Sequence, residues 1–263
     1  MMDAYTQLGD LALLLGLSTI RLSVAFLLLP MFTQESLPGV VRNSLFVGLA
    51  VMTLAVQPLA APAQMDPGRW IVLFGKEAFI GLAIGIFASS LLWAVESAGM
   101  LIDGKAGTSM GQMVDPLSGN QTSNTGLFLA RLGTYVFMAS GGFMFLVGLL
   151  LESYAVWPVI STLPQLRPDA SDSFESALAR MMLLMLMLAA PVLVVLFVAD
   201  LALGLINRYA PGLNLLTIAP ALKSLLAVLL LMMMLGSMID LLVNEFTVRN
   251  LGILRLIDSL FSR

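Results

Sequence analysis

The sequence contains no cysteine and no histidine among its 263 residues. Disulfides, thiol catalysis and metal sites built from cysteine or histidine are therefore excluded. Histidine is also the side chain whose charge changes most readily near neutral pH. Any acid–base chemistry would depend on carboxylates, lysine, tyrosine or serine, and we expect neither a cofactor nor a bound metal.

Charged residues are also scarce. They make up 11% of the chain, whereas a typical soluble domain has about 25%, and the formal net charge is only −3. A soluble surface needs more charge than this, and a nucleic-acid-binding surface needs clustered positive charge. The composition therefore predicts a membrane protein that does not bind nucleic acid.

Apolar residues dominate instead, at 59% of the chain, and the mean hydropathy is +0.96. A helix needs about 20 apolar residues to cross a bilayer. Six segments approach that length: Leu11–Phe32, Leu45–Ala63, Trp70–Val95, Leu132–Leu151, Met181–Leu205 and Ser224–Val243. We therefore expect an all-α, multi-helix integral membrane fold with broken helices, in a single domain covering residues 1–263.

The flanks of these segments add two expectations. Asp3 and Asp10 precede the first segment, where a signal peptide would carry basic residues, so we expect this segment to remain in the mature chain. A short apolar run, 153–166, contains Pro158 and Pro164. Proline interrupts helices, so this run is predicted to be a connector or a broken helix.

The basic residues give no clear orientation. If the six segments cross a membrane in alternation, five basic residues lie on one side and six on the other. A multi-pass protein normally has a clear excess of lysine and arginine in its cytoplasmic loops. The balance indicates that the helices do not all cross in simple alternation, and that other protein chains cover part of their apolar surface.

Packing features mark the first and third apolar segments. Three small residues share one face of the third segment at four-residue spacing, which lets helix backbones approach closely: Gly81, Gly85 and Ser89. We expect a close helix contact there, within the chain or with another subunit.

Three charged residues lie within these apolar segments. Lys76 and Glu77 are expected to form an internal or subunit-contacting pair, and Arg21 is expected to be paired or to extend toward water.

Two polar stretches with glycine and proline separate the apolar segments. The first, residues 104–126, reads GKAGTSMGQMVDPLSGNQTSNTG, and the second, residues 200–224, reads DLALGLINRYAPGLNLLTIAPALKS. Non-helical backbone at membrane depth is tolerated only where protein buries it or where it lines a water-filled cavity. We expect both stretches to line a pore or an interface, with Pro211 and Pro220 interrupting the helix. Asp200 is expected to pair with Arg208 or Lys223.

Two other classes of function have weaker support in the sequence. A small secondary transporter could form a substrate site at the broken helices, with Asp103, Asp200 and Asp240 carrying protons. The two polar stretches show no repeat relation, which disfavours it. An enzyme is disfavoured because the sequence has no nucleophile elbow, no phosphate-binding loop and no paired carboxylates at a catalytic spacing. No catalytic residue is expected.

The motifs of the two polar stretches resemble those of the type III secretion export-gate subunit T, the SctT/FliR family. The first motif is IDGKAGTSMGQMVDPLSGNQ, a Gly/Met-rich loop with an Asp-Pro step. The second motif runs from an Asn-Arg-Tyr-Ala-Pro run to Pro-x-x-Lys, and its family positions are Asp200, Asn207, Arg208, Pro211, Asn214 and Lys223. Chain length and segment order match as well, so the resemblance covers essentially the whole chain.

The resemblance favours the injectisome branch over the flagellar one. The Lys223-Ser224 step is typical of the injectisome branch. Gly212 stands where glutamine is frequent in the family, and leucines at 215 and 216 replace a frequent aromatic residue. These departures bear on the branch more than on the family.

The resemblance implies a non-enzymatic subunit of a helical gate in the bacterial inner membrane, partly raised toward the periplasm. Such a gate is formed with R and S subunits and conducts unfolded proteins. The implied further partners are the U and V export-gate subunits, inner rod or needle components, and membrane lipid. The Gly/Met loop is implied to plug the gate from inside, and the residues implied to plug it or line its lumen are Gly107, Thr108, Ser109, Met110, Gly111, Gln112, Met113, Asp115 and Pro116. Glycine allows such a loop to rearrange, and methionine gives soft contacts.

The C-terminal residues 248–263 have a different pattern. Leu251, Leu254, Ile257 and Phe261 recur at three- and four-residue spacing between charged residues. This pattern predicts an amphipathic helix that lies on a membrane surface or docks on a partner.

Overall fold

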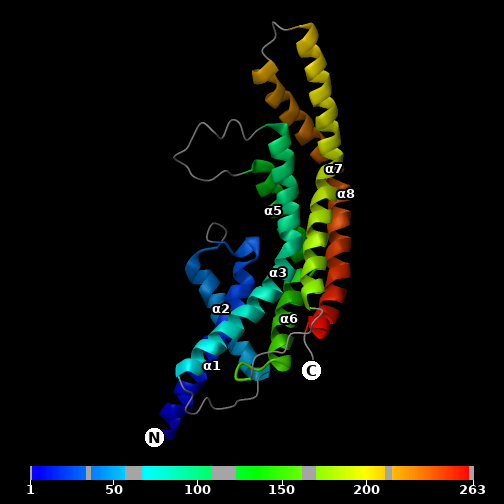
Figure 1. The fold of residues 1–263 in the computed structure, drawn as a ribbon. Helices are drawn as coiled ribbons and strands as arrows, with labels where there is room; N and C mark the ends of the chain where they lie inside the picture. Colours follow the sequence, from blue (N-terminus) through cyan, green and yellow to red (C-terminus); the bar gives the residue numbers. More distant parts are fainter. Residues whose placement is uncertain are drawn as a thin grey trace. The chain divides into compact units, whose positions relative to one another are not determined.

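The computed structural model describes residues 2–33, 37–56, 67–107, 123–161, 170–210 and 215–260. Within these ranges every regular element is a helix and no strand occurs (Figure 1). The elements are α1 (Met2–Leu27), the short 3-10 helix η1 (Pro30–Phe32), α2 (Gly39–Val56), α3 (Pro67–Ala106), α5 (Asn124–Ala139), α6 (Gly142–Val156), α7 (Ala170–Tyr209) and α8 (Leu215–Leu260). The all-α class predicted from the sequence is confirmed.

The fourth predicted segment is not one helix. It was expected to run without a break over Leu132–Leu151, but α5 ends at Ala139 and α6 begins at Gly142. Gly141 lies between them with a φ of 78°, in the left-handed region that glycine enters at little steric cost. A count of apolar residues misses this break because glycine interrupts the helix without adding polarity.

The expectation that Pro220 interrupts the helix was wrong. α8 begins at Leu215 and includes Pro220. Pro220 is the sixth residue of α8, beyond the first four N–H groups that lack partners within a helix, so the helix continues through it with one i→i−4 hydrogen bond missing. The Ser224 hydroxyl donates to the Pro220 carbonyl at 2.6 Å. The sequence therefore placed the start of the last helix too late.

The chain divides into two compact units. The first comprises residues 1–90, 141–177 and 249–263. Its core contains α1, η1, α2, the first part of α3, and α6. Aromatic rings fill its centre: the Phe26 ring centroid lies 4.9 Å from that of Phe32, 5.7 Å from that of Phe46 and 6.0 Å from that of Phe143. These contacts join helices that are far apart in sequence.

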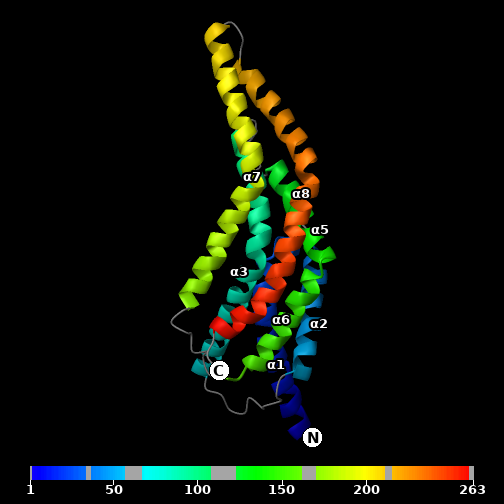
Figure 2. The same ribbon diagram turned by 90° about the vertical axis from the view of Figure 1, so that its right-hand side faces the viewer.

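The second unit comprises residues 91–140 and 178–248. It contains the later part of α3, α5, and most of α7 and α8. α8 runs antiparallel to α7 (Figures 1 and 2). An ion pair of 2.6 Å joins Arg180 of α7 to Glu245 of α8, and the Phe137 ring of α5 meets Phe246 of α8 edge to face.

Length and composition leave fewer candidate membrane spans than the sequence suggested. Of the described helices, three are long and apolar enough to cross a membrane: Gly68–Ala106, Phe174–Tyr209 and Ile218–Thr247. α5 and α6 would make a fourth if counted as one broken span, and the apolar parts of α1 and α2 are shorter. The described helices therefore provide three or four candidate spans, and six alternating spans are not supported by their lengths.

Candidate functional site

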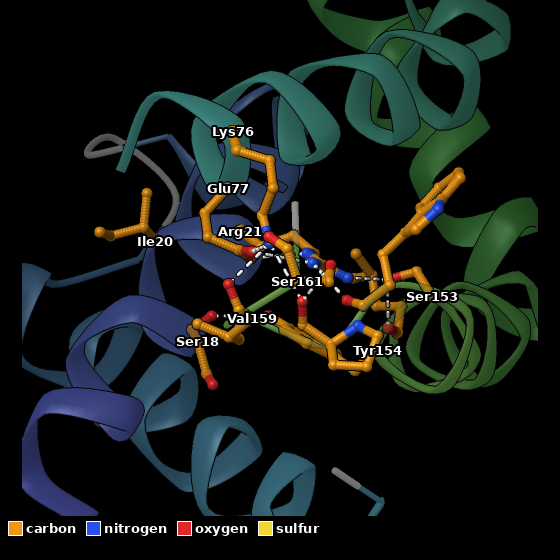
Figure 3. Close-up of polar contacts among 12 residues, drawn as sticks. Ser18, Ile20, Arg21, Lys76, Glu77, Ser153, Tyr154, Val159 and Ser161 are labelled. Atoms are coloured by element: carbon orange, nitrogen blue, oxygen red, sulfur yellow. Dashed lines mark hydrogen bonds and ion pairs between the residues drawn. The ribbon is translucent and has the colours of Figure 1, made fainter. Parts of the chain in front are cut away.

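A cluster of buried charges lies inside the first unit (Figure 3). We define the Arg21 cluster as Arg21 of α1, Lys76 and Glu77 of α3, and Ser153 and Tyr154 of α6. The Arg21 guanidinium donates from Nε to Oε2 of Glu77 at 2.8 Å and from Nη2 to Oε1 at 3.0 Å. Both side chains are fully buried. Two parallel bonds of this kind form the strongest geometry available to an arginine–carboxylate pair.

The other polar atoms of Arg21 also have partners. Nη1 donates to the Ser153 hydroxyl at 2.9 Å, and Nη2 donates to the Trp157 carbonyl at 3.0 Å. The guanidinium carbon lies 4.0 Å from the centre of the Tyr154 ring, and the Tyr154 hydroxyl donates to the Ser18 carbonyl at 2.6 Å. A buried charge is tolerated when its bonding capacity is filled in this way.

Lys76 extends the Arg21 cluster to the segment that follows α6. Its Nζ lies 3.2 Å from Oε1 of Glu77. It also donates to the carbonyls of Pro158, Val159 and Ser161 at 3.0, 2.6 and 3.3 Å. Residues 157–161 are not helical, so their carbonyls can turn toward the ammonium group, and the Pro158 carbonyl also accepts from the Ser161 amide at 3.0 Å. The sequence correctly predicted an interrupted helix here but gave no indication of its role.

A close crossing of α1 and α3 brings the cluster together. A Cβ added to Gly81 would lie 2.5 Å from the Arg21 carbonyl oxygen, and one added to Gly85 would lie 3.0 Å from Ala25. The third small residue, Ser89, donates its hydroxyl to the Gly85 carbonyl of its own helix at 2.7 Å. The close contact expected at Gly81 and Gly85 therefore lies within the chain, one turn after Glu77.

The base of the first polar stretch has its own polar cluster, in the second unit. Asp103 on the last turns of α3 is 9% exposed. Its Oδ2 accepts from the Ser123 hydroxyl at 2.7 Å and from the Thr125 amide at 2.9 Å, and its Oδ1 accepts from the Thr125 hydroxyl. Gly107, expected to line the plug, has a φ of 84° and ends α3, with its amide donating to the Asp103 carbonyl.

The second polar stretch also meets the end of α3. Asp200 of α7 pairs with Lys223 of α8 at 3.0 Å and with Lys105 at 2.7 Å. The Lys223 ammonium donates in addition to the Lys105 carbonyl at 3.2 Å. Of the two partners expected for Asp200, the structure gives Lys223, and it adds Lys105, which the sequence did not suggest.

The remaining motif residues are placed only in part. Asn207 and Arg208 lie on the last turn of α7 and are exposed. Pro211 and Asn214 lie outside the described residues, as do eight of the nine residues expected to plug or line the lumen: Thr108, Ser109, Met110, Gly111, Gln112, Met113, Asp115 and Pro116. The backbone of α8 extends to Leu260 and so includes much of the C-terminal helix expected at 248–263.

Sequence reasoning missed the pairing of Arg21 with Glu77 and the role of Asp103. One signal was available for the first pair: a lone arginine and a Lys-Glu step in two apolar segments each need a buried partner of opposite charge. Among the described residues, no group of three carboxylates gathers in a way that could hold a metal ion. The Arg21 cluster and the hydrogen bonds of Asp103 join helices to one another.

Comparison with known proteins identifies the family of the chain. Residues 12–248 match the family described as "Bacterial export proteins, family 1". The chain belongs to this family. The resemblance predicted from the two polar motifs, to the SctT/FliR family of type III secretion export proteins, is thereby confirmed.

Individual relatives refine the assignment. The chain is 35% identical over 212 residues to Yop proteins translocation protein T of Yersinia pestis, covering 80% of this chain and 81% of that protein. It is 30% identical over 233 residues to Surface presentation of antigens protein SpaR of Salmonella typhimurium, covering 87% and 85%. Flagellar biosynthetic protein FliR of Bacillus subtilis is 27% identical over 238 residues, covering 88% and 92%. The identities favour the injectisome branch.

Proposed function

We propose that the chain is a non-enzymatic subunit of the type III secretion export gate in the bacterial inner membrane. It forms, with the R and S subunits, the channel through which unfolded proteins leave the cytoplasm. The observation that carries this proposal is the family match over residues 12–248, which includes both polar motifs. The U and V subunits and the inner rod or needle components are the further partners, and part of the assembly is raised toward the periplasm.

We further propose that residues 104–126 supply the plug of this gate. A plug has to stop ions and yet yield to an arriving polypeptide. Glycines 107 and 111 allow the backbone to change conformation, while Met110 and Met113 offer flexible, polarizable contacts that reseal around varied side chains. Asp115 with Pro116 favours a turn at the far side.

Shortening the loop tests the plug. Deletion of residues 108–113 is expected to make cells that overproduce the assembled gate leak small ions, because the lumen loses its closing contacts. Influx of a membrane-impermeant ion measures the effect. The matched control keeps the full loop and carries Met232→Ala, at an exposed position of α8. The gate with this control variant is expected to stay closed. Unchanged influx after the deletion would overturn the plug.

Single cysteines test where the loop lies. The chain has no cysteine of its own, so Met110→Cys and Met113→Cys each introduce one thiol into a clean background. We expect crosslinks from these positions to a stalled secretion substrate. Met144→Cys, on an exposed position of α6, is the control and is expected to give none. Crosslinks from Met144 alone would contradict a lumenal loop.

A further inference from the structure

The N-terminus of α5 is held by a residue of another helix. The first N–H groups of a helix lack partners within it, and Ser123 satisfies one of them as the N-cap by accepting from the Gly126 amide at 2.8 Å. Asp103 of α3 satisfies another by accepting from the Thr125 amide. Its negative charge also lies at the positive end of the α5 dipole. α5 is therefore capped partly from within and partly by α3.

The same two helices touch backbone to backbone beside this cap. A Cβ added to Gly99 of α3 would lie 2.5 Å from the Cα of Gly126. A Cβ added to Gly126 would lie 3.1 Å from the Met100 side chain of α3. Neither helix can approach more closely, and the hydrogen bonds of Asp103 resist their separation. The relative position of residues 99–107 and 123–126 is thus defined by sterics and by hydrogen bonding together.

The upstream end of the same stretch is also held. The Gly107 amide donates to the Asp103 carbonyl at 3.1 Å. The Lys105 carbonyl accepts from Lys223, and the Lys105 ammonium pairs with Asp200. Both ends of the first polar stretch therefore meet at one turn of α3, and the side chain and the backbone of Asp103 contact one end each.

We infer that Asp103 is a positioning residue that fixes the two ends of the plug loop to each other. Asp103 thereby keeps the base of the loop, residues 103–107 and 123–126, unchanged while the gate opens and closes. The inference rests on the proposed function for its consequence, which is that the plug loop always enters the lumen at the same position. The distance between the two ends of the loop can be measured without any transport assay.

Distance measurements test the base directly. Gly104 is exposed and has nothing within 4 Å of an added Cβ, and Asn124 is exposed on the first turn of α5. Spin labels on Gly104→Cys and Asn124→Cys in the assembled gate are expected to give one narrow distance distribution, with or without a stalled substrate. Asp103→Ala is expected to broaden it, and the Thr125 amide is expected to exchange at least about tenfold faster.

Further variants keep the test decisive. Asp103→Asn retains one acceptor oxygen and is expected to give an intermediate width. Thr125→Val removes a single hydroxyl donor at similar volume and replaces Asp103→Ala if the alanine variant does not accumulate. Asp240→Ala removes an exposed carboxylate of α8 and is expected to leave both the distances and the exchange rate unchanged.

Ion influx then separates the two proposals. We expect the Asp103→Ala gate to leak, at a normal level of assembled gate, as the gate with residues 108–113 deleted does. Unchanged distances in Asp103→Ala would overturn the positioning role. The role would also be overturned if Asp103→Ala broadens the distance distribution but its gate stays closed, while the gate with residues 108–113 deleted leaks. A shortened loop that does not leak overturns the plug alone, and the distance measurement then decides the role of Asp103.

Discussion

The Arg21 guanidinium and the Glu77 carboxylate are both fully buried, and Lys76 is 2% exposed. The cluster thus contains two positive charges and one negative charge. Moving charges out of water is costly, and a buried pair is tolerated because its partners compensate that cost. Glu77 compensates both cations at once, so the three residues are not equivalent.

Removing the carboxylate should therefore cost more than removing the guanidinium. Glu77→Gln leaves two buried cations beside each other, whereas Arg21→Met leaves the Lys76–Glu77 pair intact. We expect Glu77→Gln to destabilise the protein by about 3–5 kcal/mol or more, and Arg21→Met by less. The thermal unfolding midpoint of the chain in the purified gate measures the difference.

An exposed pair provides the control for this prediction. Arg180 and Glu245 form a bidentate pair, but the Arg180 side chain is 50% exposed. Exposed pairs contribute about 0–1 kcal/mol, so Arg180→Met is expected to leave the midpoint nearly unchanged. Equal losses for Glu77→Gln and Arg21→Met would contradict the charge argument.

At the scale of elements, the face of α3 that carries Gly81 and Gly85 determines how close α1 can lie. The crossing is tight enough that even a methyl group at Gly81 would overlap the Arg21 backbone. Gly75 lies on the same helix but has nothing within 4 Å of an added Cβ. The two glycines therefore differ in surroundings and not in secondary structure.

The two positions make a matched pair for alanine substitution. Gly81→Ala forces α1 away from α3 and weakens the Arg21–Glu77 bonds, and we expect a loss of about 1–3 kcal/mol. Gly75→Ala only improves helix propensity and should be neutral or stabilising by up to about 1 kcal/mol. The amount of folded chain in membranes and its unfolding midpoint measure both. A similar loss at both positions would show that helix packing is not the cause.

The helices were predictable because long apolar runs give a strong signal, and each of the six predicted segments is mostly helical in the described part of the chain, although the first and the fourth are each divided between two helices. Their ends were less predictable. The break at Gly141 depends on one backbone angle, and α8 continues through Pro220 although a proline removes one helix hydrogen bond. Of the site, the pairing of Asp200 with Lys223 was among the expectations, while the partners of Arg21 and Asp103 come from helix crossings that no local pattern encodes.

At the scale of the whole molecule, the apolar helices differ in how far the chain itself covers them. In the apolar window of α3, 72% of residues are buried, but only 28% in α7 and 22% in α8. Large apolar side chains therefore face outward from α7 and α8, among them Met182, Leu186, Val194, Phe197, Leu225, Met232 and Met233. Lipid or protein has to cover this surface.

The proposed gate assembly predicts that protein covers much of it. In cells that lack the R and S subunits, we expect the chain to fall to a small fraction of its normal level in membranes, because the uncovered helices expose it to degradation. In the wild type, mild detergent should extract it together with these subunits. Immunoblotting and co-purification measure both effects. A chain that accumulates equally well alone would contradict the assembly and indicate that lipid suffices.

The Arg21 cluster has a consequence for biosynthesis. Arg21, Lys76 and Glu77 leave the ribosome early. Their later partners are the Ser153 hydroxyl and the carbonyls of Trp157, Pro158, Val159 and Ser161. Between these halves the ribosome makes residues 91–140, which belong to the second unit. Until α6 and the residues after it have been translated, the Arg21, Lys76 and Glu77 side chains therefore have only one another as partners within the Arg21 cluster.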